Sequence, residues 1–120
     1  MNLLTNLQAI LQHGSNANGQ FGRLANGWQT CLRADLSAAN VSTAEGSVFR
    51  SADISWTFPA AFLAGSKPVV QVTGEHTALI GASIVALSNT AATVRVKAAT
   101  AIAGAVTLQA SATGRWSDMT

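Results

Sequence analysis

The chain has 120 residues, a length that allows one domain with a single hydrophobic core. Only 10% of its residues are charged and the formal net charge is +2, whereas about a quarter of the residues in an ordinary soluble domain are charged. The seven basic residues are dispersed without a run, which disfavours a nucleic-acid partner. The single Cys31 excludes a disulfide within one chain and a cysteine-based zinc site.

No targeting or membrane segment is visible in the sequence. The N-terminus lacks the basic start and the cleavage pattern of a signal peptide, and no stretch has the roughly 18 uninterrupted apolar residues of a membrane span. We therefore expect a protein that is made and assembled in the cytoplasm, without membrane insertion. Its weakly charged surface also favours extensive contact with other subunits.

The first 13 residues predict one short amphipathic helix, because their apolar residues follow helical spacings of three and four. A helix of about 12 residues is marginal alone in water. Its apolar stripe must therefore dock on its own domain or on the same helix of other subunits, as an anchor or a trimerisation seed. The expected contact residues are Leu3, Leu4, Leu7, Ile10 and Leu11.

After this segment the sequence changes from a helical period to a strand period. Residues 14–19 are rich in Gly, Asn and Ser and predict a linker. Two extended runs then flank Asn26 and Gly27, the favoured pair for a type I′ hairpin turn. From residue 20 to the end of the chain, we expect one β domain.

Further short strands follow at intervals, separated by Gly, Pro, Asn or Ser, and predict an all-β antiparallel sandwich or barrel. In residues 93–97, apolar and charged side chains alternate. Val94 and Val96 are therefore expected to face the core, with Arg95 and Lys97 facing out. The strand runs cover residues 48–58, 69–73, 82–87, 93–98 and 105–112.

Residues 14–31, GSNANGQFGRLANGWQTC, resemble a segment that recurs in the C-terminal parts of phage tail fibres and related virion proteins. Residues 56–62, WTFPAAF, followed by KPVVQV, resemble the signature of the H-type lectin domain. The closing residues 112–116, ATGRW, are similar to the end of such fibre-tip domains. Around Pro59, Phe58 and Phe62 are expected to form a bulged corner in the core.

The resemblance implies a small antiparallel β-sandwich of about six strands, preceded in our interpretation by the short N-terminal α-helix. Members of these families are typically trimers that bind glycans or serve as adhesive tips. The β domain, residues 20–120, is accordingly expected to be a fibre-tip domain. The aromatic rings of Trp28 and Trp116 are expected to pack against the protein rather than stack on a sugar.

Candidate ligand-binding residues are polar groups on turns or outward strand faces. Glu75 and His76 place a carboxylate and an imidazole side by side in the loop of residues 74–81, and both groups can hydrogen-bond sugar hydroxyls. On the outward face of a strand, Arg95 and Lys97 are the second pair of candidates. Two adjacent polar residues on an exposed turn are, however, more often simply solvated.

Catalytic chemistry is not expected. The sequence has five acidic residues and two histidines, and none falls in a recognisable nucleophile, phosphate-loop, zinc or calcium motif. We therefore expect a protein that is not an enzyme and that holds no metal or cofactor.

The sequence thus predicts a virion protein, assembled in the host cytoplasm, that acts as a fibre or spike. Its expected role is a homotrimeric tip that binds a glycan or receptor on the host cell and joins other virion proteins through the N-terminal helix. The alternative is a structural head-fibre, decoration or connector protein without a ligand of its own.

Overall fold

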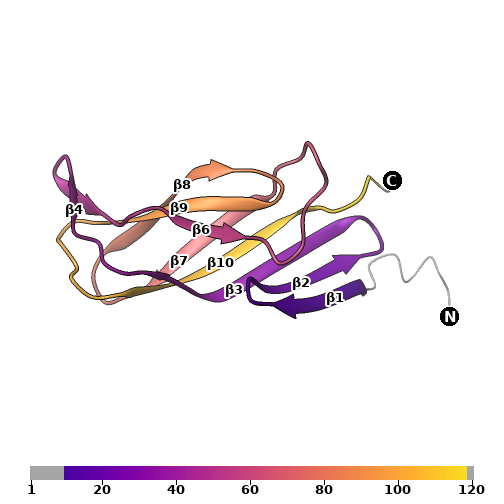
Figure 1. Ribbon diagram of the computed structural model, residues 1–120, viewed down its shortest axis with the longest axis horizontal. Helices are drawn as coiled ribbons and strands as arrows, with labels where there is room; N and C mark the ends of the chain where they lie inside the picture. The colour runs from indigo at the N-terminus through magenta and orange to yellow at the C-terminus, as the bar shows by residue number, and fades with distance from the viewer. Residues whose placement is uncertain (1–9, 119–120) are drawn as a thin grey trace.

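The computed structural model describes residues 10–118, and this part of the chain contains ten β-strands and no helix (Figure 1). The all-β class agrees with the alternation read from the sequence, whereas the expected number of about six strands is too low. The strands are β1 (Ile10–Asn16), β2 (Gly19–Leu24), β3 (Trp28–Ala38), β4 (Thr43–Glu45), β5 (Val48–Arg50), β6 (Ile54–Thr57), β7 (Val69–Glu75), β8 (Ile80–Leu87), β9 (Ala91–Ala98) and β10 (Val106–Arg115).

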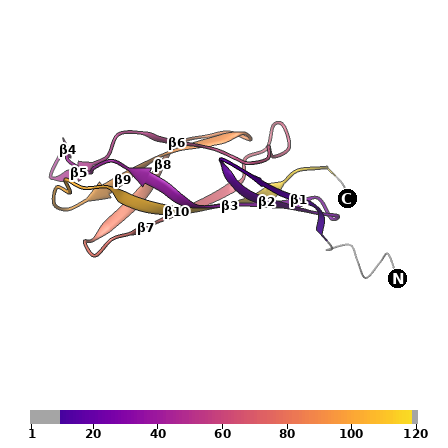
Figure 2. The same ribbon diagram turned by 60° about the horizontal axis from the view of Figure 1, so that its bottom comes forward.

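The strands form two antiparallel sheets that lie as layers in an elongated sandwich of 56 × 26 × 22 Å (Figure 2). The first sheet has the order β1-β2-β3-β10-β7, and the second has the order β4-β5-β9-β6, with β8 on the other edge of β9. Because β5 pairs with residues 97–98 and β6 with residues 91–94, these two short strands follow one another along the same side of β9.

The core lies between the sheets and follows the alternation of the two longest antiparallel pairs. In β9, Val94 and Val96 are fully buried, as predicted, while Arg95 and Lys97 point outward and are half-buried. In β10, every second residue from Val106 to Gly114 is buried. Small side chains dominate both strands, which suits two sheets packed face to face.

Three aromatic rings close one end of the core. Trp56, at the end of β6, meets Phe58 edge-to-face at a centroid separation of 5.0 Å, and Phe58 meets Phe62 in the same way at 5.1 Å. All three are buried, so the predicted core position of the rings around Pro59 is confirmed. Trp28, which we expected to be packed, is 44% exposed instead.

The predicted N-terminal helix is wrong. Residues 10–13 belong to β1, which pairs with β2 in a register that joins Gln12 to Arg23 and Asn16 to Gly19. The helical spacing of the leucines is a local signal, and the cross-strand hydrogen bonds to β2 override it in this part of the segment. Leu3, Leu4 and Leu7 lie outside the described residues, and Ile10 and Leu11 are described by their strand backbone alone.

Residues 14–19, for which we expected a linker, form the end of β1, a two-residue turn and the start of β2. The next hairpin also differs from its predicted turn type. Gly27 N–H donates to the Leu24 carbonyl at 3.0 Å, which puts Asn26 at the third turn position, where its φ is negative. Gly27 carries the positive φ of 95°, so the loop has three residues and a glycine bulge instead of a type I′ turn.

Candidate functional site

The segment that resembles tail fibres, residues 14–31, and the segment that resembles the H-type lectin signature, residues 56–62, meet in space. Three side chains from the first three strands donate hydrogen bonds to three consecutive backbone carbonyls, those of residues 59–61, in the β6–β7 connection. The donors are Asn16 at 3.0 Å, Gln29 at 2.9 Å and Arg23 at 3.1 Å. A backbone segment outside a ladder needs such partners for its carbonyl groups. These motif residues therefore brace the fold.

Gln29 is the centre of this bracing. It is 1% exposed, and its side-chain oxygen accepts a hydrogen bond from Arg23 Nε at 2.6 Å while its amide donates to the carbonyl of Ala60. Cys31 is fully buried beside it and acts as a small packed side chain. Burial raises the pKa of the Cys31 thiol, so it stays protonated at neutral pH.

An open cleft of about 680 Å³ lies on the outer side of the first sheet, where the tip of the β1–β2 hairpin approaches β3. The β3–β10 ladder is bulged at this point, because Ala34 and Asp35 oppose the single Gln109. Bulges redirect side chains and are over-represented beside functional sites. The cleft is lined by Ser15, Asn16, Ala17, Gly19, Gln20, Leu32, Arg33, Ala34, Asp35 and Gln109.

The bulge presents a cation and an anion at the cleft. Arg33 Nε donates to Asp35 Oδ1 at 2.9 Å, and the side chains are 23% and 82% exposed. Within residues 10–118, the two Nη groups of Arg33 and the second oxygen of Asp35 have no hydrogen-bond partner. Leu32, 48% exposed, contributes apolar surface beside them. The cleft therefore offers donors, an acceptor and an apolar wall.

Gln109 connects this cleft to one of the predicted site residues. Its side-chain amide donates to Glu75 Oε1 at 2.6 Å, so Glu75 lies next to the cleft although it does not line it. His76 is exposed, and its Nδ1 accepts the backbone N–H of Ala78 at 3.0 Å, which stabilises the turn after β7. The structure ends β7 at Glu75, so the expected loop of residues 74–81 is reduced to residues 76–79. Of the two candidates, Glu75 is thus the one that the fold couples to the cleft.

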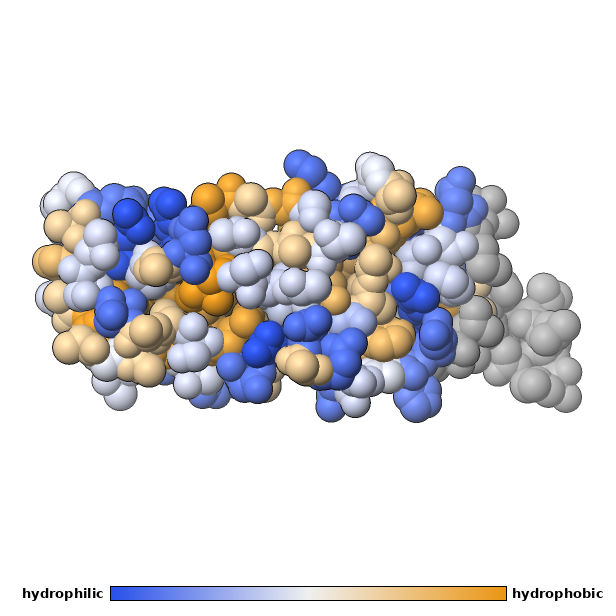
Figure 3. All heavy atoms as spheres, in the orientation of Figure 1, coloured by the Kyte–Doolittle hydropathy of each residue, from blue (hydrophilic) through white to orange (hydrophobic). Residues whose placement is uncertain are grey.

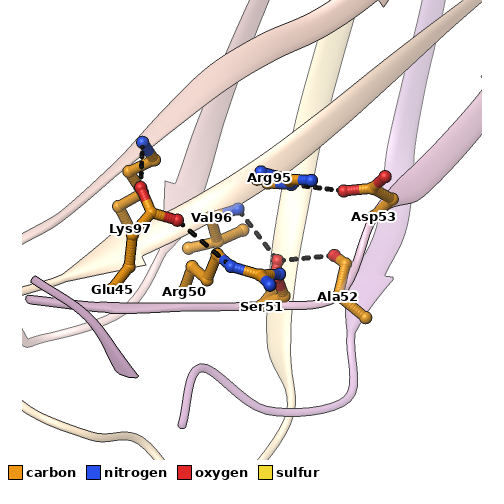
Figure 4. Close-up of polar contacts among 8 residues, drawn as sticks. All are labelled: Glu45, Arg50, Ser51, Ala52, Asp53, Arg95, Val96 and Lys97. Atoms are coloured by element: carbon orange, nitrogen blue, oxygen red, sulfur yellow. Dashed lines mark hydrogen bonds and ion pairs between the residues drawn. The ribbon is translucent and has the colours of Figure 1, made fainter. Parts of the chain in front are cut away.

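Arg95 and Lys97 belong to β9 in the second sheet and are not brought together with Glu75 by any contact. Each forms an ion pair across the outer face of that sheet (Figure 4). Lys97 Nζ lies 2.9 Å from Glu45, and Arg95 Nε contacts Asp53. A ligand that engaged either cation would have to compete with these carboxylates.

The same ion pairs change the acidity of the carboxylates. The hydrogen bond from Lys97 holds the pKa of Glu45 below its usual value, and that from Arg95 lowers the pKa of Asp53. Glu45 also lies 3.1 Å from Arg50 (Figure 4). Between these pairs, the buried Ser51 Oγ accepts the N–H of Val96 at 2.9 Å, so the pairing with β9 continues through the short connection from β5 to β6.

Sequence reasoning missed Arg33, Asp35 and Gln109. In the folded chain, the alternation of buried and exposed residues in β3 is interrupted between Cys31 and Leu36. An interruption of a period-two pattern is the expected mark of a bulge. The partner strand that completes the cleft lies more than 70 positions further along the chain, so the pattern alone does not reveal it.

Two solved structures share this fold. The first is a C-terminal fragment of the P. aeruginosa R1 pyocin fibre, with a TM-score of 0.56 and 20% identity; the match covers 92% of this chain and 30% of that one. The second is an N-truncated R1-type pyocin tail fibre, with a TM-score of 0.56, 19% identity and 93% of each chain covered. The chain therefore has the fold of a pyocin tail-fibre domain.

The comparison with protein-family models found no match, and neither did the comparison with curated proteins. The likeness in fold agrees with the tail-fibre part of the sequence resemblance. Neither solved structure is described as an H-type lectin, so that part of the resemblance stays a prediction. In the described residues, no three His, Cys, Asp or Glu side chains gather as metal ligands would. Residues 10–118 also contain no helix long and apolar enough to cross a membrane.

Proposed function

We propose that this chain is a domain of a phage-type virion fibre that assembles as a homotrimer and binds a saccharide on the host cell without catalysing a reaction. The observation that carries the proposal is the likeness of nearly the whole chain to the tail-fibre fold. The open cleft at the β3 bulge supplies a place for the ligand. Attachment to other virion proteins would use the segment before β1.

Two surface properties support assembly with other copies. Only 10% of the residues are charged, so little repulsion opposes contact between subunits. Apolar side chains also gather along the edge formed by β8, where Ile84 is 44% and Val85 46% exposed (Figure 3). Among the described strands, β8 pairs with β9 alone, which leaves its other edge open. Exposed apolar surface of this kind marks interaction sites.

Assembly is tested by light scattering of the purified protein at micromolar concentration. A trimeric mass supports the proposal, whereas a monomeric mass contradicts it. A trimer matters for function because three weak sites that engage one cell together bind far more tightly than one.

A non-catalytic role is consistent with how the acidic residues are used. Glu45 and Asp53 are occupied by ion pairs on the second sheet, and Glu75 accepts a hydrogen bond from Gln109. A glycoside hydrolase of the common kind needs two carboxylates facing one cleft, and the described cleft has Asp35 alone. Binding is therefore the chemistry that this arrangement favours.

Host binding is tested by adsorption of the full-length protein to host cells and to a glycan array. Wild type is expected to bind, and Glu75→Ala to bind more weakly, because this change removes the partner that orients Gln109 at the cleft. His76→Ala is the matched neighbour and tests whether the loop itself contacts the ligand. If wild type adsorbs to neither cells nor glycans, the structural connector role replaces this proposal.

A further inference from the structure

We infer that the cleft at the β3 bulge binds a neutral saccharide through two adjacent hydroxyl groups, which contact the ion-paired Arg33 and Asp35. This inference rests on the proposed function and names the class of its ligand. Here, uncommitted donors and acceptors lie beside apolar surface in a concave part of the molecule. Small-molecule sites generally combine these features.

The polar groups of the cleft divide into committed and available atoms. Asn16 is committed, because its amide donates to the carbonyl of Pro59 and its oxygen accepts the N–H of Asn18 at 2.8 Å. The available groups include the two Nη of Arg33, the second carboxylate oxygen of Asp35 and the exposed side chain of Gln20. Donors and acceptors are both represented.

A hydroxyl group can satisfy both kinds at once, because it donates one hydrogen bond and accepts others. A guanidinium donates only, and an ionised carboxylate accepts only. Since Arg33 and Asp35 are joined at 2.9 Å, their free atoms lie side by side. Two neighbouring hydroxyls of one ring can therefore accept from Arg33 and donate to Asp35. The half-exposed Leu32 offers apolar surface to the carbon face of the same ring.

The same geometry disfavours an acidic sugar. A ligand carboxylate drawn to Arg33 would lie close to Asp35, whose charge already partly neutralises the guanidinium. Like charges at such short range repel each other. A simple cation is disfavoured in the same way by Arg33. The arrangement thus selects a neutral polyhydroxylated ligand over an ion of either sign.

The test uses pairs of methyl glycosides that differ only at carbon 6, methyl glucoside with methyl glucuronide and methyl galactoside with methyl galacturonide. Binding is followed by backbone amide shifts of the assembled protein during titration. A neutral member is expected to shift amides of residues 15–20, 32–35 and 109, and to bind at least fivefold more tightly than its acidic counterpart. Asp35→Asn is expected to weaken binding of the neutral sugar at least fivefold. It is also expected to reduce the difference in affinity between the neutral and the acidic sugar.

Asp118→Asn removes an exposed carboxylate outside the cleft and is the charge-matched control, expected to bind like wild type. Retention of the wild-type amide spectrum shows that each variant is folded. Equal or tighter binding of the acidic sugar overturns this inference, and so does a binding protein whose cleft amides do not shift. Either result leaves the proposed function standing if wild type still adsorbs to cells. Loss of all adsorption overturns the proposed function itself.

Discussion

The indole N–H of Trp56 donates a hydrogen bond to the backbone carbonyl of Asn18 at 2.8 Å and thereby joins the second sheet to the tip of the first hairpin. Trp56 is fully buried and also packs edge-to-face on Phe58. One side chain thus links the core to the hairpin that forms one wall of the cleft. The position of that wall depends on this contact.

Trp56→Phe is therefore expected to lower the free energy of unfolding by about 2–3 kcal/mol, because it leaves a cavity and removes the partner of the Asn18 carbonyl. Urea denaturation measures the change. Trp28→Phe is the matched control, since Trp28 is 44% exposed, and it should cost less than about 1 kcal/mol. Equal losses in the two variants would contradict the linking role of Trp56.

Gln29→Leu keeps a side chain of similar size but removes the amide oxygen and the amide nitrogen through which Gln29 forms its hydrogen bonds. The change leaves the Ala60 carbonyl and Arg23 Nε without their present hydrogen bonds. We expect a loss of about 1–3 kcal/mol in the free energy of unfolding. Gln71→Leu, on the exposed face of β7, should stay within about 0.5 kcal/mol of wild type. A Gln29→Leu protein as stable as wild type would show that the network is dispensable.

Gly19 begins β2 with a φ of 127°, and a Cβ at this position would collide with the backbone carbonyl oxygen of Leu32. Because that oxygen belongs to a neighbouring strand, relief requires the hairpin to move. Gly19→Ala is expected to destabilise the protein by more than about 2 kcal/mol. It is also expected to change the amide shifts of the cleft residues, since Gly19 lines the cleft.

Gly22, three residues further along the same strand, provides the control for that substitution. A Cβ at Gly22 has no neighbour within 4 Å. Gly22→Ala should therefore leave stability within about 1 kcal/mol of wild type or raise it, because alanine restricts the unfolded chain. Thermal unfolding of the two variants side by side gives the comparison. Equal thermal stability of Gly19→Ala and Gly22→Ala would contradict the close approach of the backbone at Gly19.

Stability is expected to fall in acid partly through Asp53. Its pKa is lowered in the folded protein by the hydrogen bond from Arg95, so the folded state binds this proton less readily than the unfolded state. The resulting stabilisation is fully present above the unfolded pKa and is lost as the pH falls through the folded one, from roughly pH 5 downward. Asp53→Asn should therefore show a shallower loss of stability in acid than wild type.

Arg95→Gln tests the cause of that effect, because it removes the donor that lowers the pKa of Asp53. Urea midpoints measured at neutral pH and at two acidic values give the slopes. In Asp53→Asn and in Arg95→Gln, the urea midpoint should fall less steeply with decreasing pH than in wild type. The double variant should show no larger reduction of this slope than either single variant. If the urea midpoint of Arg95→Gln fell with pH as steeply as that of wild type, the acid sensitivity would belong to other carboxylates.

The class of fold followed from the sequence because the periodicity of a half-buried strand is local. The alternation around Val94 and Val96 placed those residues in the core, and Pro59 placed a bend between Phe58 and Phe62. Each inference depended on residues only a few positions apart. The fibre resemblance was carried in the same way by contiguous segments, and the fold of the pyocin fibres agrees with it.

Pairing between distant strands decided the rest. Residues 10–13 have helical spacing, yet their backbone groups pair with β2, whose position is unknown until the sheet forms. The cleft likewise requires Arg33 and Asp35 from a bulge in β3 and Gln109 from β10, which antiparallel pairing places opposite one another. Arg95 and Lys97 look like free cations in the sequence, but folding brings Asp53 and Glu45 against them. A local sequence pattern indicates the periodicity of a strand. Its hydrogen-bond and ion-pair partners, in contrast, are set by contacts between residues far apart in the chain.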